Sequence, residues 1–143
     1  MALGRALSAA IVGVTATIVD VEANVGPGLP RIQIVGLADT AISESRDRMK
    51  TAVANSQLHW PKTKVVVSLS PASMPKAGSH FDVAMCLAIL TASSTDPLVR
   101  QRLSETVLLG EVGLDGSLRP VAGVLPVLMA ARRAGVRRVI VPQ

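Results

Sequence analysis

The sequence predicts a mixed α/β fold, with helices covering a mainly mixed β-sheet, for three reasons. Its expected order of elements is strands, helix, strand, helix, hairpin, helix and strand, which is typical of layered α/β domains. Its hydrophobic fraction is 49% and its charged fraction is 17%, as in globular chains. Its 143 residues suffice for one core, so we expect a single domain over residues 1–143.

The first expected elements are strands. Residues 7–25 favour extended structure, with Gly13 at a bend or hairpin. Within residues 19–23, apolar side chains alternate with acidic ones, which indicates a strand with one exposed face. Glycines and prolines mark a loop over residues 26–30, and residues 31–37 follow as another strand.

An amphipathic helix is expected from Thr40 to about Ser56, with Asp39 as its N-cap. Glu44 and Arg48 are four residues apart, a favourable spacing for an ion pair on the exposed face. The predicted buried face consists of Ile42, Ser45, Met49, Ala52 and Val53.

The middle of the chain repeats the change from extended to helical patterns. Residues 64–70 form an expected strand, and residues 81–90 form an almost entirely apolar helix that we expect to be buried. The connection after this helix is polar and allows a short helix from Pro97.

The last third of the chain contains the clearest turn. Asp115 and Gly116, between two extended runs, predict a hairpin with a type I′ turn. Residues 124–135 predict a helix that ends at a glycine and carries two arginines in its last turn, where the helix dipole favours cations. Residues 136–143 predict a closing strand.

Charge is unevenly distributed along the chain. Residues 1–58 hold five basic and five acidic side chains, whereas residues 59–143 hold ten basic and five acidic ones, which accounts for the net charge of +5. A basic half is compatible with an anionic partner such as nucleic acid, and equally with a solvated surface. With one Phe, one Trp and no Tyr, the chain lacks platforms for stacked bases, so any nucleic-acid contact should be to phosphates.

A reducing, cytoplasmic setting is expected. Cys86 is the single cysteine, so it can form neither an internal disulfide nor a two-thiol metal site. A signal peptide over the first residues is the alternative, but polar and acidic side chains recur there at strand-like spacing. No apolar run reaches the ~18 residues of a transmembrane helix, so no membrane partner is expected.

Motifs for nucleotides and metals do not occur. Lys, Gly and Ser within residues 75–79 stand in a different order from that of a P-loop. Residues 24–30 lack the third glycine of a dinucleotide fingerprint. His59 and His80 are far apart, and neither stands at metal-ligand spacing from Cys86, so we expect neither a cofactor nor a metal in this chain.

The loop and helix start in residues 74–85, MPKAGSHFDVAM, concentrate several reactive side chains. Ser79, His80 and Asp82 are too close in sequence to form a triad with one another, and helix capping is the simpler account. Lys76 precedes a helix N-terminus and could meet an anion there, with a solvated lysine as the plain alternative.

Three long blocks of the sequence resemble the N-terminal domain of the bacterial Mg-chelatase-like AAA+ proteins, the YifB/ComM family. The blocks are residues 28–53, 65–90 and 108–142. The resemblance covers nearly the whole chain, from Ser8 to Pro142. Ala38 stands where the family usually has Pro, and His80 stands where it usually has a small polar residue.

The resemblance implies a two-layer fold like domain 2 of ribosomal protein S5, which Lon-type protease domains share. In the full-length protein it implies an AAA+ ATPase module after residue 143, with ATP and Mg²⁺ as cofactors of that module. It also implies a role like that of the DNA motors of competence and recombination. Chelation of magnesium is not implied.

The Lon likeness can be compared residue by residue. The nucleophilic Ser of Lon-type sites falls at His80, with Ser79 one position away, and their catalytic Lys falls at Val127. A serine without a base stays protonated and weakly nucleophilic. We therefore expect a degenerate site without catalysis, with a residual serine hydrolase as the least favoured alternative.

The resulting expectation is a non-catalytic accessory domain that helps its own AAA+ module and neighbouring subunits to form a ring, and that contacts DNA phosphates. The alternative is an oligomerisation module without DNA contact. The candidate anion-binding residues are Lys76, Arg119, Arg132, Arg133, Arg137 and Arg138.

Overall fold

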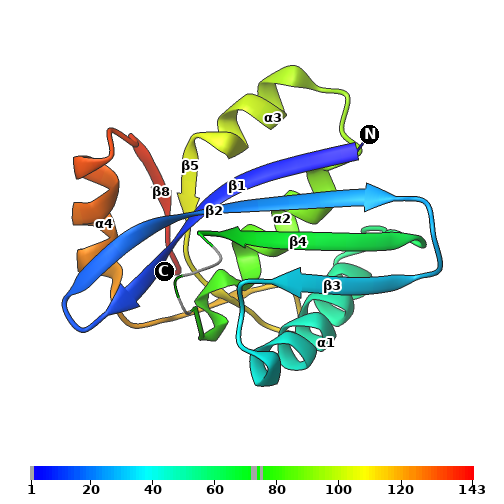
Figure 1. Ribbon diagram of the computed structural model, residues 1–143, viewed down its shortest axis with the longest axis horizontal. Coiled ribbons are helices and arrows are strands. Elements are labelled where there is room, and N and C mark those ends of the chain that lie inside the picture. The colour runs from blue at the N-terminus through cyan, green and yellow to red at the C-terminus, as the bar shows by residue number, and fades with distance from the viewer. Residues whose placement is uncertain (1, 72–73, 75) are drawn as a thin grey trace.

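The computed structural model describes residues 2–71, 74 and 76–143, and it has the mixed α/β architecture that the sequence predicts (Figure 1). The strands are β1 (Ala2–Val12), β2 (Thr15–Gly26), β3 (Arg31–Val35), β4 (Lys64–Ser70), β5 (Thr106–Leu108), β6 (Glu111–Val112), β7 (Leu118–Arg119) and β8 (Arg138–Ile140). The helices are α1 (Asp39–Asn55), α2 (Asp82–Thr91), α3 (Pro97–Ser104) and α4 (Val124–Arg133), with a short 3-10 helix, η1 (Ser79–Phe81), before α2.

Six of the described strands form one mixed sheet in the order β3-β4-β2-β1-β5-β8. β1 and β2 form a long antiparallel hairpin, in which Ala2 lies opposite Val25 and Val12 lies opposite Thr15. The expected bend at Gly13 is this turn, and its φ of 61° suits a residue without a Cβ. β4 is antiparallel to β2, whereas the pairs β3–β4, β1–β5 and β5–β8 are parallel.

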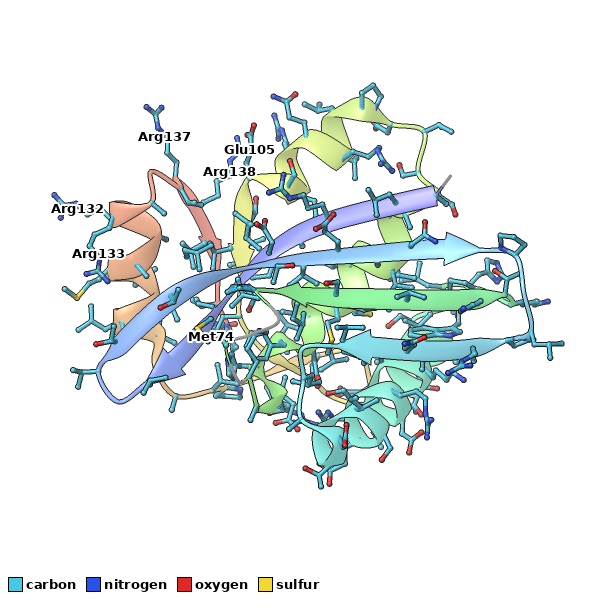
Figure 2. The ribbon with its side chains drawn as sticks, in the orientation of Figure 1. Met74, Glu105, Arg132, Arg133, Arg137 and Arg138 are labelled. Carbon is cyan, nitrogen blue, oxygen red and sulfur yellow. The ribbon has the colours of Figure 1, made fainter. Side chains whose placement is uncertain are left out.

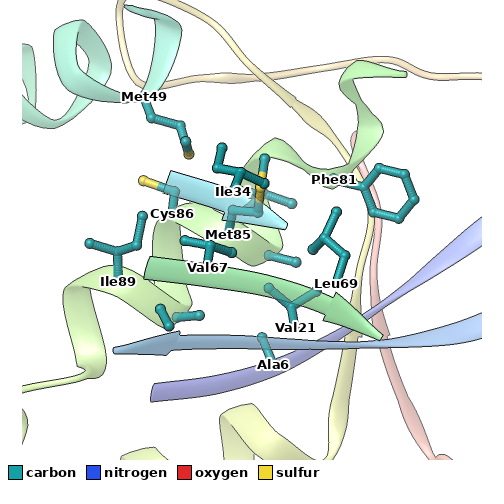
Figure 3. Packing of buried hydrophobic residues seen from close by; sticks show 14 of the residues in the cluster. Ala6, Val21, Ile34, Met49, Val67, Leu69, Phe81, Met85, Cys86 and Ile89 are labelled. Carbon is teal, nitrogen blue, oxygen red and sulfur yellow. The ribbon is translucent and has the colours of Figure 1, made fainter. Parts of the chain in front are cut away.

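Alternating residues of β1 and β2 supply two hydrophobic cores on opposite faces of the sheet. The larger core lies against α1 and α2 and includes Val21, Met49 and Phe81, whose exposed fraction is zero (Figure 3). The smaller core lies beneath α4. α2 packs closely on β1, since a Cβ at Gly4 would overlap the carbonyl of Ala88. The helices therefore cover both faces, but α4 covers only the end near the β1–β2 turn (Figure 1).

Two expected details of local geometry are wrong. Ala38, not Asp39, is the N-cap of α1, and Asp39 lies in the first helical turn, where its charge still favours the helix dipole. The β6–β7 hairpin exists, but residues 113–117 connect its strands, so the connection has five residues instead of two. Gly116 donates its N–H to Gly113, and its φ of 89° closes the loop.

Several element boundaries agree with the sequence pattern. β4 spans the expected residues 64–70, and the apolar helix α2 begins one residue later than expected. The short helix expected from Pro97 is confirmed as α3. Asp96 caps it, because its carboxylate accepts hydrogen bonds from the N–H groups of Leu98 and Val99.

Candidate functional site

Four of the predicted anion-binding residues lie together at one corner of the molecule. Arg132 and Arg133 end α4, Arg138 begins the neighbouring β8 with Arg137 just before it, and the tight turn at Gly135 (φ 77°) joins the two pairs (Figure 2). We call these four residues the arginine cluster. All four are exposed, and none makes an ion pair or side-chain hydrogen bond with a described residue. Their charges are therefore available to an anion from outside.

The other two predicted residues lie elsewhere. Arg119 is exposed on β7, with its Nε beside Gly113, and it faces Asp115, whose pKa is lowered mainly by the hydrogen bonds from Ser117 and less by this arginine. Arg119 is thus next to a carboxylate of its own hairpin. Arg119 is therefore not part of the arginine cluster, and an anion that approached it would also approach the carboxylate of Asp115.

Lys76 is not the exposed loop lysine that the sequence suggested. Its side chain is buried, and its ammonium donates to the carbonyl oxygens of Pro71 and, at 2.7 Å, of Met74. Burial lowers the pKa of Lys76. Met74 lies near the middle of the molecule, away from the arginine cluster (Figure 2). In this position the ammonium binds Pro71 and Met74 and does not face solvent, which argues against an anion contact.

The residues at the Lon-like positions lie on α4 and in η1. Val127 is fully buried in the core beneath α4. His80 lies in η1, and its Nε2 lies 2.9 Å from the carbonyl oxygen of Ala9 in β1, so Nε2 carries the proton. Burial lowers the pKa of His80, which favours the neutral ring. Ser79 makes no side-chain hydrogen bond within the described part of the chain.

A buried ionic network near η1 was not predicted. The Asp82 carboxylate has no exposed surface, and it accepts hydrogen bonds from Ser45 Oγ at 2.7 Å and from Arg48 Nε at 2.7 Å. Arg48 Nη2 and the N–H of Val112 complete its shell, at 3.1 and 3.3 Å. The hydrogen bond to Asp82 raises the pKa of Arg48. The network joins α1, α2 and β6.

One feature of the sequence could have predicted this network, although the apolar helical pattern around it drew attention away from it. Asp82 is the one charged residue in the apolar run of residues 81–90, and a carboxylate buried there requires donors. The expected pair between Glu44 and Arg48 does exist, at 3.9 Å. Arg48 nevertheless points mainly inward to Asp82, so its assignment to the exposed face was wrong.

No group of three or more His, Cys, Asp or Glu side chains comes together among the described residues in a way that could hold a metal ion. None of the helices in residues 2–71, 74 and 76–143 combines the length and apolarity needed to cross a membrane. Lys76, in the loop whose residues stand in a different order from that of a P-loop, uses its ammonium on the carbonyl oxygens of Pro71 and Met74.

Comparison with known proteins identifies relatives over the whole chain. Residues 21–143 match the model of the family described as subunit ChlI of Mg-chelatase. An uncharacterized protein of Mycobacterium tuberculosis is 49% identical over 142 residues, which cover 99% of this chain and 28% of that protein. YifB of Escherichia coli is 37% identical over 141 residues, covering 99% of this chain and 27% of YifB. The competence protein ComM of Haemophilus influenzae is 35% identical over 143 residues, covering 100% of this chain and 28% of ComM.

The expected Lon likeness is also found. The Lon protease of Phenylobacterium zucineum is 32% identical over 130 residues, which cover 85% of this chain and 16% of that enzyme. The chain spans less than a third of the length of these relatives. With the ChlI model matching most of its residues, and with YifB and ComM aligned from end to end, the chain belongs to the YifB/ComM family of Mg-chelatase-like proteins.

Proposed function

We propose that this chain is a non-catalytic accessory domain of a Mg-chelatase-like AAA+ protein and that it contacts DNA phosphates through the arginine cluster. The observation that carries the proposal is the placement of the arginine cluster at the end of α4 and the start of β8, exposed and without described ion-pair partners. Arginine suits phosphate because its planar group donates in parallel pairs. The name of the relative ComM, a competence protein, agrees with a DNA partner.

Neutralising the cluster tests the DNA contact. Binding of a fluorescein-labelled duplex is measured by anisotropy at ~50 mM salt, where phosphate contacts are strong. A variant with all four cluster arginines changed to Gln should lose most of the binding. The control changes Arg31, Arg46, Lys50 and Lys62 to Gln, which removes the same four charges, from +5 to +1, at other places. Equal losses in both variants, or no binding by the unchanged protein, would refute the proposal.

A second function, ring assembly through this domain, has its own supporting observation. Five large apolar side chains are 42–89% exposed on the β1–β2 turn and on the outer face of α4, namely Val12, Val14, Leu125, Leu128 and Met129. The turn and the helix lie at the same end of the molecule (Figure 1). Exposed apolar groups gathered in this way are typical of protein interfaces. Sizing of the longer protein with Leu125→Asp and Met129→Asp, against the unchanged protein, tests it.

We also propose that the chain has no hydrolase activity of its own. Ser79 has no hydrogen-bonded base among the described residues, and Val127 offers none at the Lon-like lysine position. A serine-reactive fluorophosphonate probe tests this. Labelling at Ser79, lost in Ser79→Ala, would show a nucleophile that the geometry does not account for.

A further inference from the structure

An open hollow of about 560 Å³ borders the arginine cluster. Three parts of the chain line it: Leu7 of β1, the end of α3 at Ser104 with the following Glu105, and residues 135–138 between α4 and the start of β8. Its size falls in the range of small-molecule sites, about 300–1,000 Å³. The hollow therefore has room for a ligand larger than a simple ion.

One wall of the hollow carries a carboxylate beside the arginines. β5 and β8 are parallel, with Thr106 opposite Arg138. The residues just before these strands, Glu105 and Arg137, therefore lie at the same edge of the sheet. Figure 2 shows Glu105 next to Arg138. Glu105 is exposed and makes no ion pair with a described residue, and its carboxylate accepts one long hydrogen bond, 3.5 Å from Gln101 Nε2. Two arginine cations and a carboxylate are thus open to the same ligand.

These charges together select the chemistry of the ligand. A phosphate alone would be attracted by Arg137 and Arg138 but repelled by Glu105. A ligand that fills the hollow must therefore present hydrogen-bond donors to the carboxylate as well as negative charge to the arginines. A nucleotide has both, because its phosphate is anionic and its base carries N–H groups.

Guanine is the base that fits a carboxylate best. Its Watson–Crick edge presents two neighbouring donors, N1–H and the N2 amino group, to the two oxygens of Glu105. The same edge of each other base places an acceptor next to its donor. Pairing occupies the guanine donors in a duplex, so the base must be unpaired. Because the contact uses the edge of the base, with Leu7 and Val136 as apolar neighbours, it needs no aromatic platform.

We propose that this hollow binds an unpaired guanine nucleotide of a DNA strand. Glu105 accepts hydrogen bonds from the base, and Arg137 and Arg138 contact the phosphates on either side of it. This inference rests on the proposed DNA contact of the arginine cluster, and it adds a preference among bases to that contact.

The test compares strands that differ in one amino group. Fluorescein-labelled oligothymidine with one central guanine is titrated with the chain at ~50 mM salt, where phosphate contacts are strong. The same strand with hypoxanthine in place of the guanine lacks only the N2 amino group. We expect the guanine strand to bind about tenfold more tightly, which corresponds to about 1.4 kcal/mol. Equal binding of the two strands, still lost in the variant without the cluster arginines, would overturn this inference and leave the DNA contact intact. No binding of either strand would refute both.

Glu105→Gln tests whether this carboxylate is the source of the preference. The change keeps the shape of the side chain, but a neutral amide cannot accept from both guanine donors, so the two strands should bind about equally. Glu44→Gln, at an exposed position of α1, is the matched control, because both variants raise the net charge from +5 to +6. It should keep the tenfold preference. A preference unchanged in Glu105→Gln would exclude this carboxylate as its source and overturn the proposal.

Free deoxyguanosine monophosphate separates a strand site from a site for a free nucleotide. It brings one phosphate instead of several, so it should bind at least about a hundredfold more weakly than the guanine strand. Competition against the labelled strand measures this difference. Binding as tight as that of the strand would assign the hollow to a free nucleotide and overturn the proposal.

Discussion

Arg48 and the arginine cluster show the same type of side chain in two different environments, one mostly buried and paired and the other exposed. The side chain of Arg48 is 20% exposed, and its guanidinium binds the fully buried carboxylate of Asp82. The carboxylate of Glu111 lies 3.7 Å from the same Nε. The cluster residues are exposed and lack a described partner. Removing one member of a buried ion pair is costly, because the other charge is left buried and unpaired, whereas an exposed charge without a partner contributes little to folding and is free to bind.

Lys76 shows that sequence position alone does not separate these two classes. It stands in a polar loop before a helix, as a ligand-binding lysine would, but its ammonium is buried and bound to carbonyl oxygens. It belongs with Arg48. The comparison therefore predicts which basic residues should matter for stability and which for binding.

The largest effect is expected from Arg48→Met. The change leaves the buried carboxylate of Asp82 without its main donor, and breaking such a pair costs about 3–5 kcal/mol of unfolding free energy. Urea denaturation measures it. Arg132→Met is the matched control, and it should stay within about 0.5 kcal/mol of the unchanged protein, because it is exposed.

The double variant Arg48→Met/Asp82→Leu distinguishes the net contribution of the ion pair from the cost of leaving one buried charge unpaired. Removing both partners should cost less than the sum of the two single changes, since no unpaired charge remains. Strict additivity, or an Arg48→Met variant as stable as Arg132→Met, would contradict the structural role of the network.

Lys76→Met should have the next largest effect. It keeps the aliphatic stem but leaves the Met74 carbonyl without the ammonium and the Pro71 carbonyl with only the N–H of Met74, which costs about 1–3 kcal/mol. Duplex binding by the variant should equal that of the unchanged protein at a temperature where both are folded. A loss of DNA binding with unchanged stability would move Lys76 back to the class of the cluster arginines.

Single changes in the arginine cluster should have smaller and purely electrostatic effects. Each of Arg132→Gln and Arg137→Gln should reduce the slope of log affinity for duplex DNA against log salt by about 0.9, the value of one phosphate contact. Lys62→Gln, an exposed lysine outside the cluster, is the control and should leave the slope unchanged. A slope that falls equally in all three variants would mean that only net charge attracts DNA.

Much of the fold could be predicted because its signals are local. The alternation in residues 64–70, the turn at Gly13 and the cap at Asp96 each specify an element within a few residues. The contacts of Asp82 with Ser45 and of Lys76 with Pro71 depend on how the segments pack, and periodicity does not contain that information. The four arginines of the cluster could be named as candidates from the sequence. That they lie together, and apart from Arg119 and Lys76, could be seen only in the tertiary structure.

The smallest effect is expected from His80→Gln, and it appears as a dependence on pH. Gln can keep the hydrogen bond to the Ala9 carbonyl but does not titrate. Burial lowers the pKa of His80 below its ordinary value of 6.5, so the unfolded chain binds the proton at a higher pH than the folded chain does. Between the two pKa values the unfolded state holds more protons, and stability is lost as pH falls from about 6.5, by at most about 1.4 kcal/mol per pH unit. Urea denaturation between pH 8 and pH 5 should therefore show the unchanged protein losing stability relative to His80→Gln only below about pH 6.5. A constant difference across this range would mean that the ring of His80 titrates as it does in the unfolded chain.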